Sequence, residues 1–282
     1  MLDAIPFEMP NQLPFVVVEA RIAGGLPARV LLDTGNAAPV AMLVSPDMAR
    51  RAGLALESGA EARRTAGLGD TPAVFRNARL SRISIGQLTL ENLDIGVSPA
   101  VDAVSRQIGG NVDAILGHRF VDGRILSIDY GRHLVDFHAT AGPAARAVPF
   151  TLAPARPLTL VQVTINGRGP FLMVLDSGAS TSLISPDTAI AAGVEASQDA
   201  QLGGAGGAVA GGARLGRARI TLGQLTRDGQ PIAVADVLGP IRTAAGAPID
   251  GVVGADLFGS GRIIIDYAGN RFWYDEGETA RD

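Results

Sequence analysis

Short runs of apolar residues, several of them alternating with polar residues, recur along the whole chain. Residues 15–22 (FVVVEARI) and 158–165 (LTLVQVTI) are rich in β-branched side chains and alternate in part, which predicts strands. Residues 28–33 (ARVLLD) and 171–176 (FLMVLD) are apolar at almost every position, as is typical of strands buried on both faces. The pattern therefore predicts a chain that is mostly β.

Turn and helix signals separate these runs. The Asn-Gly pair at 166–167 predicts a tight hairpin turn. Two Ser-Pro-Asp segments, at 45–47 and 185–187, are expected to begin short helices, with serine as the N-cap and proline in the first turn. Strand-like runs return at 80–97 and 218–226. We expect each half of the chain to be a small β-barrel with one or two short helices.

The same pattern is present twice. Shifted by 143 positions, Pro27 falls on Pro170 and Asp33 on Asp176, and three extra residues then follow in the first copy. Farther on, VDAILG at 112–117 matches IDGVVG at 249–254. A repeat of about 140 residues indicates a duplicated domain, because the units of solenoids are much shorter, roughly 20 to 50 residues.

We therefore expect two homologous lobes, residues 1–141 and residues 142–282, joined near residues 139–147 (ATAGPAARA). The length agrees with this division, since 282 residues exceed one average domain and suit two.

Composition and charge exclude several classes of protein. The formal net charge is −4 and no run of Lys and Arg occurs, so no nucleic-acid partner is expected. No apolar stretch approaches the ~20 residues that span a bilayer. The absence of cysteine excludes disulfides, thiolate nucleophiles and cysteine-bound metals. Residues 1–12 lack the features of a signal peptide, which fits either a cytoplasmic protein or a mature form whose leader is absent.

The candidate chemistry lies where the two fully apolar strands end. Each strand leads into a D-[ST]-G triplet, and the two triplets are Asp33-Thr34-Gly35 and Asp176-Ser177-Gly178. The strand carries the aspartate to the edge of the sheet, the hydroxyl can bond to backbone, and glycine permits a tight turn and close approach of another segment. One triplet is weak evidence, but two in matched copies, each followed by an apolar-Gly motif, are strong.

These motifs resemble the aspartic proteases of the retropepsin and pepsin type, and specifically a bacterial retropepsin-like protein in which duplication supplies both halves of the site. The resemblance implies an all-β protein of two retropepsin-like β-barrel lobes, the acid-protease fold, related by a pseudo-two-fold axis and carrying short helices. It also implies an aspartic endopeptidase that acts on peptides or proteins. Similar bacterial proteins are often exported, which favours the periplasm or secretion over the cytoplasm.

In that arrangement Asp33 and Asp176 meet. Two carboxylates roughly 3 Å apart cannot both ionise, so they share one proton and activate a water between them. Thr34 and Ser177 are expected to lock the two loops together, while Gly35 and Gly178 give the turns room. No metal or other cofactor is required, and a monomer would hold the complete site.

Two glycine-rich segments occupy similar places in the two copies and resemble the mobile flaps of retropepsins. Glycine allows a flap to move, and its backbone can pair with an extended peptide. The candidate flap residues are Gly67, Leu68, Gly69, Gly203, Gly204 and Gly206.

Two other hypotheses remain open. The chain is alternatively a non-catalytic peptide-binding module that keeps the acid-protease fold, or an obligate dimer in which a lobe pairs with the same lobe of another chain. Asn36 departs from the family pattern, which has a small apolar residue at this position. Either this residue or the three-residue insertion behind it could reshape the first loop. His118 follows the apolar-Gly motif and is expected at the surface or as a cap.

Overall fold

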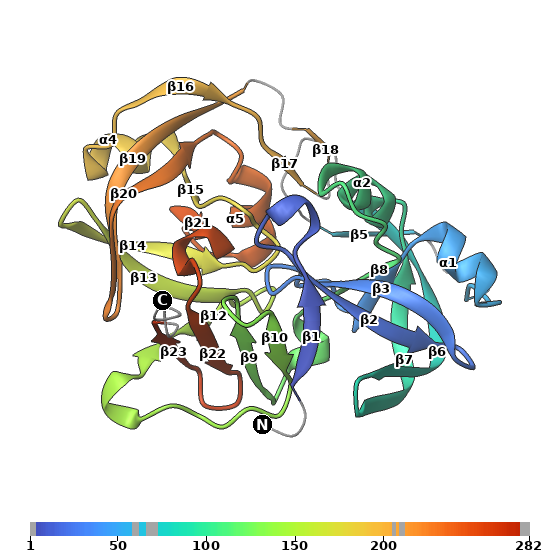
Figure 1. The fold of residues 1–282 in the computed structure, drawn as a ribbon. Coiled ribbons are helices and arrows are strands. Elements are labelled where there is room, and N and C mark those ends of the chain that lie inside the picture. Colours follow the sequence, from blue (N-terminus) through green and yellow to red (C-terminus); the bar gives the residue numbers. More distant parts are fainter. Residues whose placement is uncertain (1–3, 58–61, 66–72, 205–206, 209–211, 277–282) are drawn as a thin grey trace.

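The computed structural model describes residues 4–57, 62–65, 73–204, 207–208 and 212–276 (Figure 1). Strands dominate, and the strands of the two halves of the chain form two lobes side by side. The prediction of an all-β, two-lobed fold is confirmed.

Each lobe contains a closed barrel. In the described part of the first lobe six strands form it, and pairing of the first with the last closes it. In order around the barrel they are β2 (Val16–Ile22), β3 (Leu26–Leu32), β8 (Ala114–Leu116), β4 (Met42–Val44), β7 (Leu88–Val97) and β6 (Ala73–Ile85). The short strand β5 (Arg63–Thr65) pairs with β6 at the edge.

The second lobe repeats this arrangement, again with six strands among the described residues. Its barrel consists of β13 (Thr159–Ile165), β14 (Arg168–Leu175), β21 (Gly251–Val253), β15 (Leu183–Ile184), β20 (Leu225–Val234) and β19 (Ala213–Leu222). Strands β12 (Thr151–Leu152) and β16 (Ala196–Ala200) extend its sheet, and β17 (Gly203–Gly204) pairs only with β18 (Gly207–Ala208) in the described part.

The hairpin from β13 to β14 turns where the sequence predicted. Ile165 pairs with Arg168, so Asn166 and Gly167 form the two-residue loop. Both have positive φ angles, 52° and 73°, which asparagine and glycine tolerate better than other residues.

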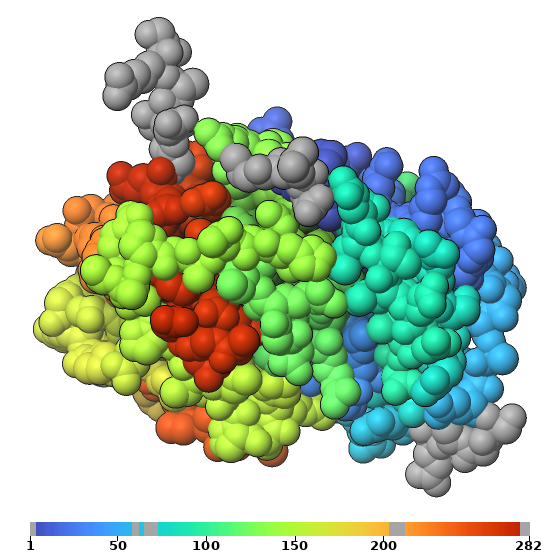
Figure 2. All heavy atoms as spheres, turned by 90° about the horizontal axis from the view of Figure 1, so that it is seen from below, coloured from blue at the N-terminus to red at the C-terminus, as the bar shows by residue number. Residues whose placement is uncertain are grey.

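A further sheet joins the lobes, in the lower part of Figure 1. In spatial order its strands are β11 (Val148–Pro149), β23 (Arg271–Asp275), β22 (Arg262–Asp266), β9 (Ile125–Asp129), β10 (Leu134–Asp136) and β1 (Ile5–Glu8). Seen from below, the connecting segment lies across the C-terminal strands (Figure 2). Trp273 Nε1 in β23 donates to the Pro143 carbonyl of this segment at 2.9 Å, which holds the connection in place.

The pairing of β9 with β22 is reciprocal. Asp129 pairs with Arg262, and Ile125 pairs with Asp266. At the repeat shift of 137, Ile125 is equivalent to Arg262 and Asp129 to Asp266, so each residue pairs with the equivalent of the other. Reciprocal pairing of equivalent residues is the signature of a two-fold axis. The pseudo-two-fold axis of the molecule therefore passes between β9 and β22.

Short helices cover the barrel ends. They are α1 (Pro46–Arg51), α2 (Ala100–Gln107), α3 (His118–Val121), α4 (Pro186–Ala192) and α5 (Gly239–Ala245), with 3-10 turns η1 (Pro10–Gln12), η2 (Ala144–Arg146) and η3 (Ala255–Phe258). As predicted, α1 and α4 begin at Ser-Pro-Asp with the serine side chain as the N-cap. In the described residues no helix has the length and apolarity to cross a membrane.

Candidate active site

Each candidate aspartate stands at the end of a central strand. Asp33 follows β3 and Asp176 follows β14, and both strands run parallel to the short strand of the apolar-Gly motif. The Asp33 amide donates to the Leu116 carbonyl at 3.1 Å, and the Asp176 amide donates to the Val253 carbonyl at 3.0 Å. The two lobes therefore present their aspartates with the same backbone geometry.

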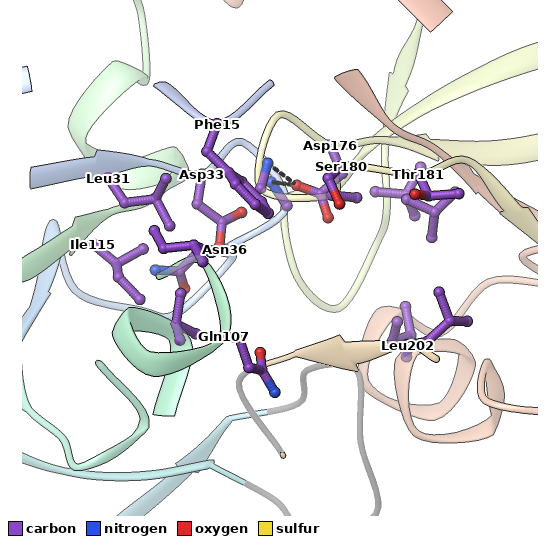
Figure 3. Close-up of a pocket in the computed structure, with 18 of the residues that line it drawn as sticks. Phe15, Leu31, Asp33, Asn36, Gln107, Ile115, Asp176, Ser180, Thr181 and Leu202 are labelled. Atoms are coloured by element: carbon purple, nitrogen blue, oxygen red, sulfur yellow. Dashed lines mark hydrogen bonds between the residues drawn. The ribbon is translucent and has the colours of Figure 1, made fainter. Parts of the chain in front are cut away.

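The two carboxyl groups face each other where the lobes meet (Figure 3). A Cβ built on Gly35 would lie 2.3 Å from Asp176 Cγ, and one on Gly178 would lie 2.5 Å from Asp33 Cγ. Any side chain at either glycine would overlap the opposite carboxylate. Glycine is thus required in both triplets for this close approach.

Thr34 and Ser177 are buried and join the two loops by four hydrogen bonds. Thr34 Oγ1 accepts from the Ser177 amide at 2.9 Å and donates to the Leu175 carbonyl at 3.2 Å. Ser177 Oγ accepts from the Thr34 amide at 3.1 Å and donates to the Leu32 carbonyl at 2.9 Å. Each hydroxyl satisfies backbone groups of the opposite lobe, so the aspartates are held at a fixed separation.

The hydrogen bonds to the two carboxylates are not symmetric. Asp176 Oδ1 accepts from the Gly178 amide at 2.7 Å and from the Gly35 amide at 3.1 Å. Asp33 Oδ1 is buried and has no hydrogen-bond partner among the described residues. Amide donors stabilise an ionised carboxylate, so this geometry favours charge on Asp176.

The pKa directions agree with that asymmetry. Burial and then the negative charge of Asp176 raise the pKa of Asp33 well above its ordinary value, and the backbone amides of Gly35 and Asn36 oppose this shift only in part. Burial also raises the pKa of Asp176, against which the hydrogen bonds from Gly178, Asp33 and Gly35 act. A site in which one carboxyl is protonated and its neighbour ionised can act as an acid and a base together.

Asn36 and the insertion leave the first loop in the same backbone arrangement as the second. The Asn36 carbonyl accepts from the His118 amide at 2.9 Å, and its equivalent Ala179 accepts from the Ala255 amide at 2.8 Å. Asn36 Oδ1 accepts from the Ala38 amide at 3.2 Å, which supports the longer turn. The extra residues are thus accommodated behind the aspartate and not beside it.

A cleft of about 490 Å³ lies between the lobes, with both aspartates at its base. Phe15, Leu31 and Ile115 line the side of the first lobe, and Ser180 and Thr181 line the other side (Figure 3). Gln107 of α2 and Leu202, just before β17, lie opposite the aspartates. A mostly apolar cleft with two acidic groups at its centre is suited to an extended peptide.

The predicted flap residues are described only in part. Gly67, Leu68, Gly69 and Gly206 lie outside the described residues. Gly203 and Gly204 form β17, which pairs with β18 in a two-stranded ribbon. This ribbon extends from the second lobe to α2 of the first (Figure 1), and Gln107 of α2 and Leu202 just before the ribbon both line the cleft.

His118 was predicted at the surface or as a cap, and this is wrong. Only 2% of its surface is exposed, and its ring packs edge-on against Tyr267 at 5.1 Å between ring centroids. Tyr267, which follows β22 and lies far away in the sequence, packs over this side chain, and a single local motif does not reveal such a contact. Burial lowers the pKa of His118, so it is a neutral core residue.

The side chains that line the cleft were not predicted from the sequence. They come from segments far apart in the chain, as Phe15, Val104 and Ile241 show. The repeat register was the available signal, because positions equivalent in the two copies line the two halves of the same cleft.

Comparison with protein families and solved structures gives a consistent result. A family model described as aspartyl protease matches residues 18–120 and 161–257, one segment in each lobe. No curated protein matches the chain.

Two solved structures match nearly the whole chain, and the first of them is similar in fold. An aspartic proteinase from Irpex lacteus is 16% identical with a TM-score of 0.58, and the match covers 99% of this chain and 98% of the other. Basic 7S globulin from soybean is 12% identical with a TM-score of 0.49, over 97% of this chain and 94% of the other. The first likeness extends over both lobes and the strands that join them.

Proposed function

Because the chain belongs to the aspartyl protease family, we propose that it is an aspartic endopeptidase in which Asp33 and Asp176 hydrolyse peptide bonds. The observation that carries the proposal is the meeting of the two carboxyl groups at the base of one cleft, held there by the Thr34–Ser177 hydrogen bonds. Thr34, Ser177 and the two glycines are positioning residues, since they fix the loops.

The reaction uses the asymmetry of the pair. Asp176, ionised and stabilised by two amides, takes a proton from a water molecule held between the carboxyl groups. The water attacks the peptide carbonyl while Asp33, which carries the shared proton, donates to the carbonyl oxygen as charge develops there. In the breakdown of the tetrahedral intermediate Asp176 gives the proton it took from water to the amide nitrogen, the C–N bond breaks, and Asp33 takes back the proton from the hydroxyl formed on the carbonyl carbon, which leaves a free acid and a free amine. This scheme needs only the two carboxyl groups and water.

The cleft supports an extended peptide as the substrate. Its walls are apolar on both sides of the aspartates, and the β17–β18 ribbon offers backbone groups near the cleft. Since both aspartates come from one chain, we also propose that a monomer is active, with lobes of residues 1–141 and 142–282.

The test is cleavage of a diverse peptide library between pH 3 and pH 8, followed by mass spectrometry. Wild type is expected to cut, and Asp33→Asn and Asp176→Asn each to lose cleavage by a factor of about 10⁴ or more, because the pair acts as a unit. Asp113→Asn is the matched control, since Asp113 Oδ2 accepts from the Arg29 amide at 2.9 Å, away from the cleft. A wild type that binds peptides and cuts none would favour a peptide-binding module instead.

A further inference from the structure

The walls of the cleft are built from equivalent residues of the two copies. Five pairs are apolar on both sides: Phe15 and Leu158, Leu31 and Val174, Leu43 and Leu183, Val104 and Ile241, and Ile115 and Val252. These pairs make the apolar part of the cleft nearly symmetric in chemistry. By itself it gives an extended peptide little reason to bind in one direction.

Other equivalent pairs that line the cleft differ in polarity, such as Asn36 and Ala179 or Gln107 and Ala244, and one pair differs in charge. Leu13 in the first lobe corresponds to Arg156 in the second, and both line the cleft. The local backbone is the same, because the Phe15 amide donates to the Leu13 carbonyl and the Leu158 amide donates to the Arg156 carbonyl, both at 2.7 Å. The duplicated fold thus places a guanidinium where the other half of the cleft has an isobutyl group.

Arg156 lies where the second lobe meets the edge strand of the first. Its Nη2 donates to the Arg64 carbonyl of β5 at 3.2 Å. Burial, and then the positive charge of Arg63, lower the pKa of Arg156. Arg63 itself stacks on Phe75, with 5.7 Å from its guanidinium carbon to the ring centroid.

The two halves of the cleft therefore differ in charge. Among the described residues that line it, the charged ones are Asp33, Asp176 and Arg156, and only the second half contributes a cation. A partly buried guanidinium gains from a carboxylate ligand, because charge-assisted hydrogen bonds are stronger where water is restricted.

We propose that Arg156 is a specificity-determining residue that binds an Asp or Glu side chain of the substrate in the half of the cleft formed by the second lobe. This rests on the proposed function, and it adds a substrate class: peptides that are apolar on one side of the cut and acidic on the other. Binding of the carboxylate also sets the direction of the peptide.

The test compares wild type with Arg156→Leu, which restores the residue of the first lobe, and with the charge reversal Arg156→Glu. The substrates are library peptides with Asp or Glu at each position in turn, paired with Asn or Gln analogues. Arg217→Leu is the control variant, because Arg217 lies in the exposed β19–β20 hairpin and donates to the Gly229 carbonyl outside the cleft.

At one position relative to the cut, wild type and Arg217→Leu are expected to prefer the acid over its amide analogue by about 10- to 100-fold in kcat/KM, the range expected of one charge-assisted hydrogen bond. Arg156→Leu should abolish that ratio, and Arg156→Glu should reverse it, so that the amide analogue is preferred over the acid. Equal kcat/KM for acid and amide in wild type, or an unchanged ratio in Arg156→Leu, would overturn the proposal.

Binding of the same peptide pairs to the Asp176→Asn variant separates this proposal from the proposed function. If wild type cuts nothing, the endopeptidase proposal fails, and the dissociation constants still decide the role of Arg156. Tighter binding of the acid that disappears when Arg156→Leu is added supports the role. Equal binding of acid and amide contradicts it.

Discussion

At the scale of single residues, the close approach of the two carboxyl groups depends on the absence of a side chain at Gly35 and at Gly178. Gly35 has no positive φ, so its backbone conformation is one that alanine can adopt. A side chain is excluded there because a Cβ would lie 2.3 Å from Asp176 Cγ. Glycine is therefore required by contact with the other lobe and not by backbone strain.

Gly35→Ala should therefore reduce kcat by at least about 100-fold, because displacement of a catalytic group by about 1 Å costs that much. Gly239→Ala adds the same methyl group at a position with nothing within 4 Å and should leave kcat unchanged. Steady-state kinetics on the two purified variants gives the comparison. Equal activities would show that the Asp176 carboxylate moves aside without consequence.

The Thr34 hydroxyl should stabilise the molecule as well as the site. Thr34→Val keeps the shape of the side chain but leaves the Ser177 amide and the Leu175 carbonyl buried without partners. We expect a loss of about 2 to 4 kcal/mol in the free energy of unfolding, measured with urea. Thr34→Ser keeps the hydroxyl and should lose much less; similar losses in the two variants would mean that these hydrogen bonds contribute little.

The sequence predicted that Asp33 and Asp176 meet and that Thr34 and Ser177 join their loops, because these residues occur in a repeated triplet. It did not predict the role that we propose for Arg156 or the burial of His118. Both depend on contacts with distant segments, namely β5 for Arg156 and Tyr267, just after β22, for His118.

At the scale of elements, serine at the start of α1 and α4 has the role that the sequence indicated. Ser185 Oγ accepts from the Thr188 amide at 3.2 Å, and Ser45 Oγ accepts from the Met48 amide at 3.1 Å. Both serines are buried, so water would not replace their hydroxyl groups as acceptors if these were removed.

Ser45→Ala and Ser185→Ala should each lower the free energy of unfolding by about 1 kcal/mol, the usual cost of removing an N-cap. Neither serine lines the cleft, so kcat/KM should not change. Chemical denaturation and kinetics on the same preparations check both statements. A variant with wild-type stability would show that the helix start is set by packing alone.

Helix α2 was not predicted, although it lines the cleft. Its N-cap Pro99 makes no side-chain cap hydrogen bond, and its eight residues are too few for a helix that is stable alone. Val101 and Ile108 instead pack into a core cluster with Phe15 and Phe75. A helix that depends on such tertiary packing has few features in its own sequence that predict it.

At the scale of the whole molecule, the repeat in the sequence indicated two lobes but not how they join. The pairing of β9 with β22 connects strands more than a hundred residues apart, and both are apolar strands with no signal for a particular partner. The structure supplies that pairing and places the pseudo-two-fold axis.

Two separate chains, residues 1–141 and 142–282, should assemble when coexpressed, because the β9–β22 pairing and the Thr34–Ser177 hydrogen bonds both cross between them. We expect the halves to copurify as a 1:1 complex with peptidase activity that each half lacks alone. Light scattering and activity assays test this. Halves that fold and remain separate would contradict the proposed division into lobes.

The pH dependence of kcat/KM tests the central claim most directly, since it reports the pKa values of the free enzyme's acid and base. At low pH both carboxyl groups are protonated and no base remains; at high pH both are ionised and no acid remains. The account predicts a bell-shaped profile whose upper limb lies well above the ordinary aspartate pKa, because burial and the charge of Asp176 raise the pKa of Asp33. Activity that stays constant from the first limb through pH 8 would contradict a shared proton.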